Sequence, residues 1–325
     1  EAHDDYFRGR SPIDRLIWRK IPEDSARIAA LKTGEIDLIT NVAYHQLPSI
    51  ERAPGVKVDK RRGLRVMYIG MNTFSTPLND VRVRKAINYA IDVDLIIEKI
   101  LDGHGVKVPG PYGEFVWPGI PEGVEGYPYD PEKAKKLLVE AGYPNGFSKI
   151  HTSKGDTPDK GVPRDKEMDL IFHSPKGRYP LDFEVSQAIV GMLEKVGIKA
   201  RLVVDEWSNF LEKYYGAKET GLYLLGWGNS LADAEGILPT LFASYGRGWY
   251  LKDDKIDELV RIGASTFDRK VRKKAYDEVY KYIVDQAYWG FLYDVVWAWG
   301  SSEDLLWIPR ADETVDARTF RVKEA

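Results

Sequence analysis

The sequence has no cysteine, and it has only five histidines and four methionines among its 325 residues. Without thiolates the chain cannot form disulfides, hold a metal through cysteine or use a cysteine nucleophile. The histidines are dispersed, and no HExxH, GxSxG or P-loop motif occurs. We therefore expect no metal, no other cofactor and no catalytic triad.

The chain also lacks a long apolar run and a strong excess of one charge. No uncharged apolar stretch approaches the roughly 18 residues that a membrane helix requires. The 47 basic and 50 acidic residues leave a net charge of -3, and the basic ones are scattered. This argues against a nucleic-acid groove or a polybasic membrane patch. The opening EAHDDYFRGR is charged, unlike a signal peptide.

Aromatic residues are abundant, at 12% of the chain, with nine tryptophans and nineteen tyrosines. Many must be core, because each buries a large apolar area, but such a share also suits a pocket that grips ligands by flat faces. The length allows two domains. No internal repeat or low-complexity tract is present.

Helix signals and apolar runs in the first half alternate, which is typical of an α/β protein. Asp24, Asp80, Asp92 and Asp130 each stand where a helix N-cap is expected. The expected elements are strands over 14–20, 36–39 and 63–73, helices over 26–31, 81–91, 93–101 and 131–141, and irregular segments over 107–130 and 148–168. The last of these is expected to be an exposed insertion.

The second half continues the alternation and contains the motif LLGWGNS. The expected elements are a strand near 168–173, a helix over 184–196, a strand over 198–204, a helix over 207–215, a strand over 221–227, helices near 253–263 and 268–286, and a strand over 288–300. Trp227 therefore lies at the carboxyl end of a strand, the edge of an open α/β sheet where ligands bind. The alternative is a core tryptophan beside a loop.

Six segments, in order and at similar spacing, resemble the oligopeptide- and dipeptide-binding proteins of ABC importers, called solute-binding protein family 5. They are ARIAALKTGEIDLI, GMNT with DVRVRKAINYAID, YDPEKAKKLLVEAGYPNGF, EVSQAIVGMLEKVGIKARLVVDEW, LLGWG, and FLYDVVWAW followed by PRADE. The resemblance implies an α/β, two-lobed periplasmic-binding-protein-like fold of type II, similar to cluster C. The implied lobes are 1–75 with 294–325, and 76–293.

Members of this family are usually much longer. They begin with a signal peptide, often with a lipid-anchored cysteine, followed by a further segment of the first lobe. The resemblance therefore implies that the first lobe is incomplete. Either the chain is a fragment of a lipoprotein-like importer component, or the remainder is a separate, missing piece. We expect the sheet of that lobe to lack strands and to expose an edge.

The motif after the late apolar strand departs from the peptide-binding pattern. Three positions after the tryptophan, such members typically have an aspartate that holds the peptide ammonium group, and here that residue is Ser230. Asp233 matches a second common acid. Neutral Asn229 and Ser230 suit amides or hydroxyls, and Trp227 is expected to be a stacking wall.

Further ligand-binding candidates follow from the expected cleft geometry. Arg178 in SPKGRYP is placed to pin a carboxylate, with a solvated surface arginine as the alternative. Trp297 and Trp299 share one face of the last strand, where they stack on a ligand or pack in the core. The remaining candidates are Tyr179, Tyr293, Asn72 and Trp117.

These observations predict binding without chemistry. We expect an extracytoplasmic, monomeric component of an ABC importer that captures a peptide or peptide-like solute and passes it to the membrane permease. An oligosaccharide is the alternative ligand, because of Ser230 and the tryptophans. The alternative classes are a glycoside hydrolase, which needs two carboxylates beside aromatic platforms, and a purely structural domain with its aromatics in the core.

Overall fold

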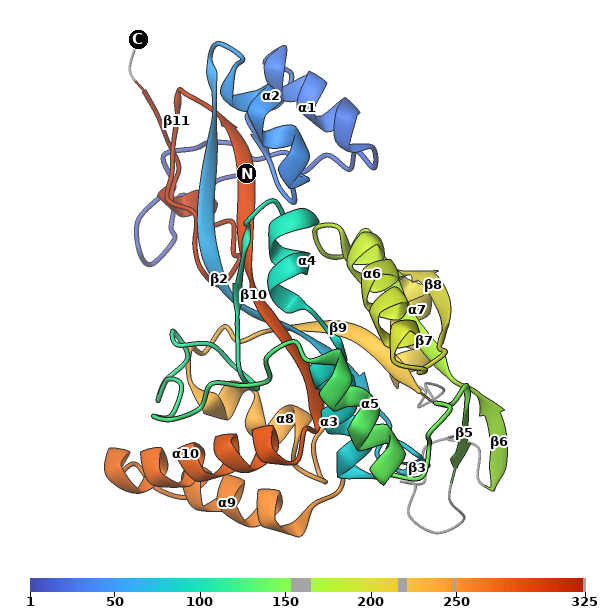
Figure 1. Ribbon diagram of the computed structural model, residues 1–325. Helices are drawn as coiled ribbons and strands as arrows, with labels where there is room; N and C mark the ends of the chain where they lie inside the picture. The colour runs from blue at the N-terminus through green and yellow to red at the C-terminus, as the bar shows by residue number, and fades with distance from the viewer. Residues whose placement is uncertain (153–164, 216–220, 248–249, 324–325) are drawn as a thin grey trace. The chain divides into compact units, whose positions relative to one another are not determined.

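The computed structural model describes residues 1–152, 165–215, 221–247 and 250–323, and it has an α/β fold (Figure 1). The chain divides into two compact units, residues 1–63 with 296–325 (unit 1) and residues 64–295 (unit 2). Two long strands, β2 (Val56–Met71) and β10 (Trp289–Ser302), contribute residues to both units. The assignment of lobes to 1–75 with 294–325 and 76–293 stays a prediction.

The main sheet has the strand order β1–β10–β2–β9–β7–β8, and β4 pairs with β10. Its shorter strands are β1 (Leu38–Ile39), β4 (Gly105–Lys107), β7 (Ile171–Lys176), β8 (Arg201–Glu206) and β9 (Leu222–Gly228). β7 runs parallel to β8 and to β9, whereas β2 and β9 are antiparallel. The carboxyl ends of β7, β8 and β9 therefore meet at one edge of unit 2, and the candidate site lies there.

Helices of unit 2 begin where the sequence places their caps. Asp80 Oδ1 accepts from the backbone N–H of Arg82 at 2.8 Å, and Asp92 Oδ1 from that of Leu95 at 2.9 Å. Asp130 Oδ1 caps the next helix through Lys133. The helices are α3 (Val81–Ala90), α4 (Val93–Lys99), α5 (Pro131–Glu140), α6 (Asp182–Lys195), α7 (Trp207–Tyr215), α8 (Leu238–Leu241), α9 (Asp254–Ala264) and α10 (Arg269–Asp285).

Unit 1 differs from the sequence prediction in two places. Asp24 is the first residue of α1 (Asp24–Lys32) rather than its N-cap, which is Glu23. The strand expected over 14–20 is wrong, because these residues form no ladder with another strand within the described residues, and Ile17 and Trp18 are exposed. The other elements of unit 1 are α2 (Leu47–Glu51), β11 (Leu305–Leu306) and β12 (Arg321–Val322), with 3-10 turns at Tyr44–Gln46 and Ala317–Thr319.

One edge in unit 1 is open within the described residues. β9 pairs only with Arg65–Met71 of β2, so the first half of β2 has no neighbouring strand on that side. An unpaired strand edge presents N–H and C=O groups to other chains. This is the edge that the sequence analysis expects for the first lobe.

A second, small sheet replaces part of the expected insertion. β5 (Lys149–Thr152) pairs antiparallel with β3 (Ser75–Thr76) on one side and with β6 (Lys166–Asp169) on the other. The prediction of an irregular segment over 148–168 is therefore wrong at both ends, because the backbone there joins a ladder. Residues 153–164 lie outside the described residues.

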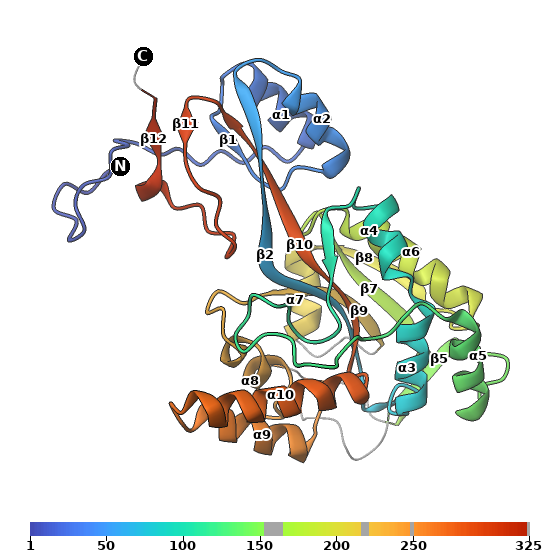
Figure 2. The same ribbon diagram turned by 60° about the vertical axis from the view of Figure 1, so that its left-hand side comes forward.

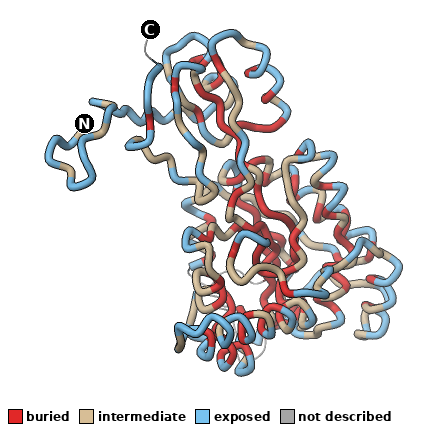
Figure 3. The backbone as a smooth tube through the Cα atoms, turned by 90° about the vertical axis from the view of Figure 1, so that its left-hand side faces the viewer, coloured by how far each residue is buried: buried red, intermediate tan, exposed pale blue. Residues whose placement is uncertain are grey.

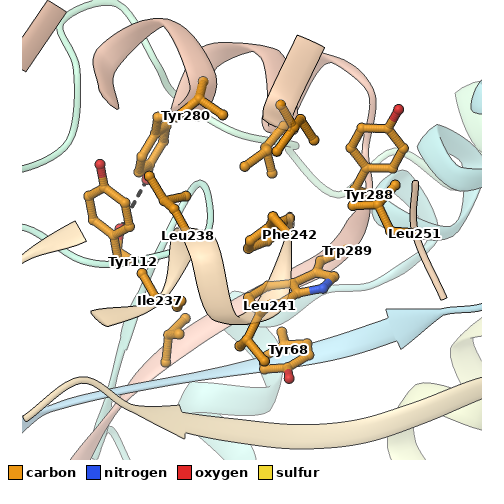
Figure 4. Close-up of a cluster of buried hydrophobic side chains, with 14 of the residues drawn as sticks. Tyr68, Tyr112, Ile237, Leu238, Leu241, Phe242, Leu251, Tyr280, Tyr288 and Trp289 are labelled. Atoms are coloured by element: carbon orange, nitrogen blue, oxygen red, sulfur yellow. Dashed lines mark hydrogen bonds between the residues drawn. The ribbon is translucent and has the colours of Figure 1, made fainter. Parts of the chain in front are cut away.

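The core of unit 2 is unusually aromatic (Figure 4). The Trp289 indole stacks on the Tyr68 ring with centroids 3.5 Å apart. The centroid of the Phe242 ring lies 4.3 Å from that of the same indole. Tyr280 donates to the backbone oxygen of Tyr112 at 3.1 Å. α9 and α10, which lie side by side as a helical hairpin, supply part of this core (Figures 1 and 2). Buried residues follow the strands, whereas the first twenty residues are mostly exposed (Figure 3).

Candidate functional site

The segment after β9 is a tight loop that Asn229 closes. The Asn229 backbone N–H donates to Leu64 O at 3.2 Å, and its Nδ2 donates to Asp233 O at 2.8 Å. Asn229 is buried, and its Oδ1 lies so close to Gly236 that a Cβ there would sit 2.2 Å away. This amide therefore stabilises the loop. Ser230, by contrast, is exposed.

Trp227 is half-buried and packs against the aromatic core of unit 2. Its indole N–H donates to Gly236 O at 2.9 Å. Successive side chains of a strand point to opposite faces. Trp227 therefore faces away from the side of Gly226, where a Cβ would meet Met67 Sδ at 2.5 Å and Tyr179 Cε1 at 3.1 Å.

Trp117 and Asp233 come together through an isolated β-bridge. The Trp117 N–H donates to Ala232 O at 2.9 Å, and the Ala234 N–H donates to Trp117 O at 2.8 Å. Arg272 of α10 lies 4.7 Å above the Trp117 ring and donates from Nη2 to Asp233 Oδ1 at 2.8 Å. The Asp233 carboxylate is therefore already paired.

The neighbouring acid, Glu235, is paired as well. It accepts a hydrogen bond from the hydroxyl of Tyr276. Burial, followed by this bond to a carboxylate, raises the pKa of Tyr276. We call Trp117, Trp227, Asp233, Arg272 and Tyr276 the tryptophan cluster. Within this cluster the positive charge of Arg272 pairs with the negative charge of Asp233.

A second group of side chains surrounds the loop after β7. The guanidinium carbon of Arg178 lies 5.0 Å from the Tyr179 ring centroid and 5.2 Å from that of Trp207. Arg65 of β2 lies 5.5 Å from the same Tyr179 ring and donates to Gly226 O at 2.6 Å. Tyr179 is buried, and its hydroxyl donates to Gly226 O at 3.1 Å. We call Arg65, Arg178, Tyr179 and Trp207 the arginine cluster.

Within the described residues, Arg178 has no carboxylate partner and no side-chain hydrogen bond. It is half-buried and held against two aromatic faces, which favour a cation electrostatically. A guanidinium in this position can bind a carboxylate through two parallel hydrogen bonds.

A buried aspartate holds the Arg178 loop. Asp182 accepts from the backbone N–H groups of Gly177, Arg178 and Tyr179 at 2.9–3.0 Å, and from that of Phe183 at 2.9 Å. Burial raises the pKa of Asp182, although these four donors favour its charged form. The loop shape is therefore set from within the protein.

The replacement Asp182→Ala is expected to leave those four N–H groups without their acceptor. We expect a loss of about 2–3 kcal/mol in the free energy of unfolding, the magnitude for hydrogen bonds to a charged group. Urea denaturation followed by tryptophan fluorescence measures it. The matched control is Asp169→Ala, an exposed aspartate on β6. Equal stability of the Asp182 and Asp169 variants would contradict this role.

The remaining predicted residues, Asn72, Tyr293, Trp297 and Trp299, are buried. Asn72 follows β2 and accepts from the Phe74 N–H at 3.1 Å. Tyr293 is opposite Lys107 of β4. Trp297 and Trp299 belong to unit 1, where Trp299 packs edge-on against Trp307 with centroids 5.7 Å apart.

Sequence reasoning missed three contributors, Arg65, Trp207 and Arg272. A lone arginine in the apolar strand GLRVMYIGM was the available signal for Arg65. The pairing of Arg272 with Asp233 joins residues 39 positions apart, and no local sequence pattern predicts it.

Within the described residues, no group of three or more His, Asp or Glu side chains is arranged to hold a metal ion. That part of the chain also has no helix long and apolar enough to cross a membrane.

Residues 1–249 match the family model described as bacterial extracellular solute-binding proteins, family 5 Middle. The chain belongs to this family. It is 31% identical over 295 residues to heme-binding protein A of Haemophilus influenzae, covering 89% of this chain and 50% of that protein. It is 28% identical over 296 residues to the dipeptide-binding protein of Escherichia coli, covering 88% and 51%. The chain thus spans about half the length of the curated family 5 relatives that it matches.

Solved structures agree with the family 5 assignment. The periplasmic binding protein DppA of Helicobacter pylori, in complex with the peptide STSA, matches with a TM-score of 0.82 and 27% identity, over 99% of this chain and 59% of that one. AppA of Bacillus subtilis, in complex with a nonapeptide, matches with a TM-score of 0.80 and 24% identity, over 100% and 63%. The predicted family and the α/β periplasmic-binding-protein fold are therefore confirmed. These relatives are named as binding proteins.

Proposed function

We propose that this protein is the solute-binding component of an ABC importer and that it captures a peptide or peptide-like solute by its carboxylate. It acts outside the cytoplasm as a monomer, passes the solute to a membrane permease and leaves it chemically unchanged. Membership of family 5 supports the class, as do the dipeptide- and oligopeptide-binding relatives. The carboxylate preference comes from the geometry of unit 2.

The observation that carries this proposal is the environment of Arg178. Desolvating a cation without a partner is costly, so a half-buried guanidinium is usually paired. The Arg178 guanidinium has two aromatic neighbours and no carboxylate partner among the described residues, which leaves its donors for a ligand. Arg65, whose guanidinium carbon lies 5.5 Å from the same Tyr179 ring, is a second cation near this loop. A solute with a carboxylate completes this group.

The loop after β9 favours a solute whose other end is neutral. Ser230 has no charge, and the Asp233 carboxylate is bound to Arg272. A peptide ammonium group would therefore find neither a carboxylate at position 230 nor an unpaired one at Asp233. We propose that Trp227 provides an apolar wall and that Ser230 hydrogen-bonds to amide or hydroxyl groups.

The replacement Ser230→Asp tests this assignment by gain of function. A new carboxylate at this exposed position is expected to tighten binding of peptides with a free ammonium group by about two- to fivefold, the magnitude of an exposed ion pair. Calorimetry with one peptide and its N-acetylated form measures the difference. Ser230→Asn is the neutral control. If both forms gain equally, Ser230 does not face the solute amino end.

The solute itself is identified by mass spectrometry of small molecules released when the purified protein is denatured. We expect a compound with at least one carboxylate and with amide groups. Recovery of a neutral oligosaccharide would contradict the proposal. A bound compound that is converted during incubation with the protein would contradict binding without chemistry.

A further inference from the structure

The end of the α9–α10 hairpin carries a dense group of positive charges. Residues 259–275 contain six basic side chains and one acidic side chain, although the whole chain has a net charge of -3. The basic residues of this segment are Arg261, Arg269, Lys270, Arg272, Lys273 and Lys274. This segment forms the end of the hairpin, where α9 stops and α10 begins (Figures 1 and 2).

Some of these charges are paired within the protein and others are not. Arg272 is bound to Asp233, Lys273 to Asp277 at 2.6 Å, and Arg261 lies 3.8 Å from Asp257. Lys270 and Lys274 are exposed, and within the described residues neither has a carboxylate partner.

The acidic residues of the hairpin lie mostly at its other end. Asp254 and Glu258 belong to the first half of α9, which lies beside the second half of α10. At that end of the hairpin, Glu278 Oε1 lies 3.6 Å from Lys255 Nζ. Asp257, Asp268 and Asp277 are exceptions. Asp257 and Asp277 pair with Arg261 and Lys273. Asp268 is at the N-cap of α10, and its Oδ1 accepts from two backbone N–H groups.

The position of the positive charges is unfavourable for the helix itself. The N-terminal end of a helix carries a partial positive charge, so cations in the first turn destabilise it. The first turn of α10 contains Arg269 and Lys270 and no acidic residue. Arg269 packs over the Trp117 ring at 5.2 Å, whereas helix stability does not account for Lys270.

Exposed apolar side chains lie among these charges. Phe267, in the four-residue turn between the helices, is fully exposed. Val271, in the first turns of α10, and Ile262, in the last turn of α9, are also exposed. A large exposed apolar side chain close to basic side chains suits the interface of a bilayer, where the ring reaches the acyl boundary and the cationic groups stay with the headgroups.

We propose that this end of the hairpin docks on a bilayer surface rich in acidic phospholipid headgroups. Phe267 enters the interface, and Lys270 and Lys274 contact the headgroup phosphates. The charge is complementary to such a surface, and juxtamembrane basic residues are attracted to it over about a Debye length. This revises the expectation of no basic membrane patch, and it is independent of the solute-binding site.

Co-sedimentation with vesicles tests the proposal. We expect the 325-residue protein to bind vesicles that contain phosphatidylglycerol, to bind phosphatidylcholine vesicles at least tenfold more weakly, and to dissociate as salt is raised. The double replacement Lys270→Glu with Lys274→Glu is expected to reduce binding more than tenfold. Phe267→Ser is expected to reduce it about threefold or more.

Matched controls separate this surface from general charge. Lys135→Glu with Lys136→Glu changes the charge by the same amount on exposed positions of α5, and Val139→Ser removes an exposed apolar side chain there. These variants are expected to bind vesicles at least half as strongly as the parent. All replaced side chains are exposed, and circular dichroism checks folding. Absence of binding to acidic vesicles would overturn the proposal and would instead fit a patch that binds an acidic protein. Hairpin variants that bind vesicles as tightly as the parent would also overturn it.

Discussion

Replacing Arg178 with alanine is expected to weaken binding of a carboxylate-bearing peptide by about 10- to 100-fold. The lost interaction is a charge-assisted, bidentate hydrogen bond, worth about 1.5–3 kcal/mol, and each 1.4 kcal/mol is a factor of ten in the dissociation constant. The side chain is held over Tyr179 and Trp207, and no carboxylate pairs with it within the described residues, so its removal leaves no internal partner unpaired. Calorimetry on parent and variant measures the effect.

Two further variants define the origin of that loss. Arg178→Lys keeps the charge but not the planar fork, and we expect an intermediate affinity. Arg201→Ala removes an exposed arginine from β8, and we expect the parental affinity. If Arg178→Ala binds as tightly as Arg201→Ala, the carboxylate is held elsewhere in the protein.

Replacing Trp289 with alanine is expected to cost about 3–5 kcal/mol in the free energy of unfolding, the range for a large aromatic removed from a packed core. The indole stacks on Tyr68 with an interplanar angle of 5° and contacts Phe242, so the cavity is lined by rigid rings that cannot collapse (Figure 4). The Tyr68 hydroxyl is also buried, and desolvation raises its pKa.

Chemical denaturation followed by circular dichroism measures this loss, and Trp18→Ala is the matched control. Trp18 is exposed in unit 1, and exposed positions change stability by about 0.5 kcal/mol or less when replaced. A Trp289 variant as stable as the Trp18 variant would mean that the aromatic cluster does not form the core of unit 2.

Local chemistry made most of the unit 2 elements predictable from the sequence. Asp80, Asp92 and Asp130 each cap a helix through their own side chain, within three residues of the group they bind. Such short-range signals depend little on the rest of the fold. The strand expected over 14–20 is wrong because a strand depends on pairing with a partner, and these residues pair with no strand in the described part of the chain.

The difference between short-range signals and contacts made only in the folded chain also explains which features of the candidate site were predictable. Trp227 was predictable as the last large residue before a loop, and Arg178 as a cation in a turn after a strand. Their separation into two clusters was not, because it depends on which face of β9 each contacts. The burial of Asn229 was also missed, because its partners Leu64 and Asp233 meet only in the folded chain.

The central claim is that a carboxylate on the solute is recognised by Arg178, and it is tested most directly with two forms of one peptide. Calorimetry on the unmodified protein compares the free acid with its C-terminal carboxamide, which differ in that single charge. We predict that the acid binds at least tenfold more tightly. Equal affinity for the two forms would contradict the account.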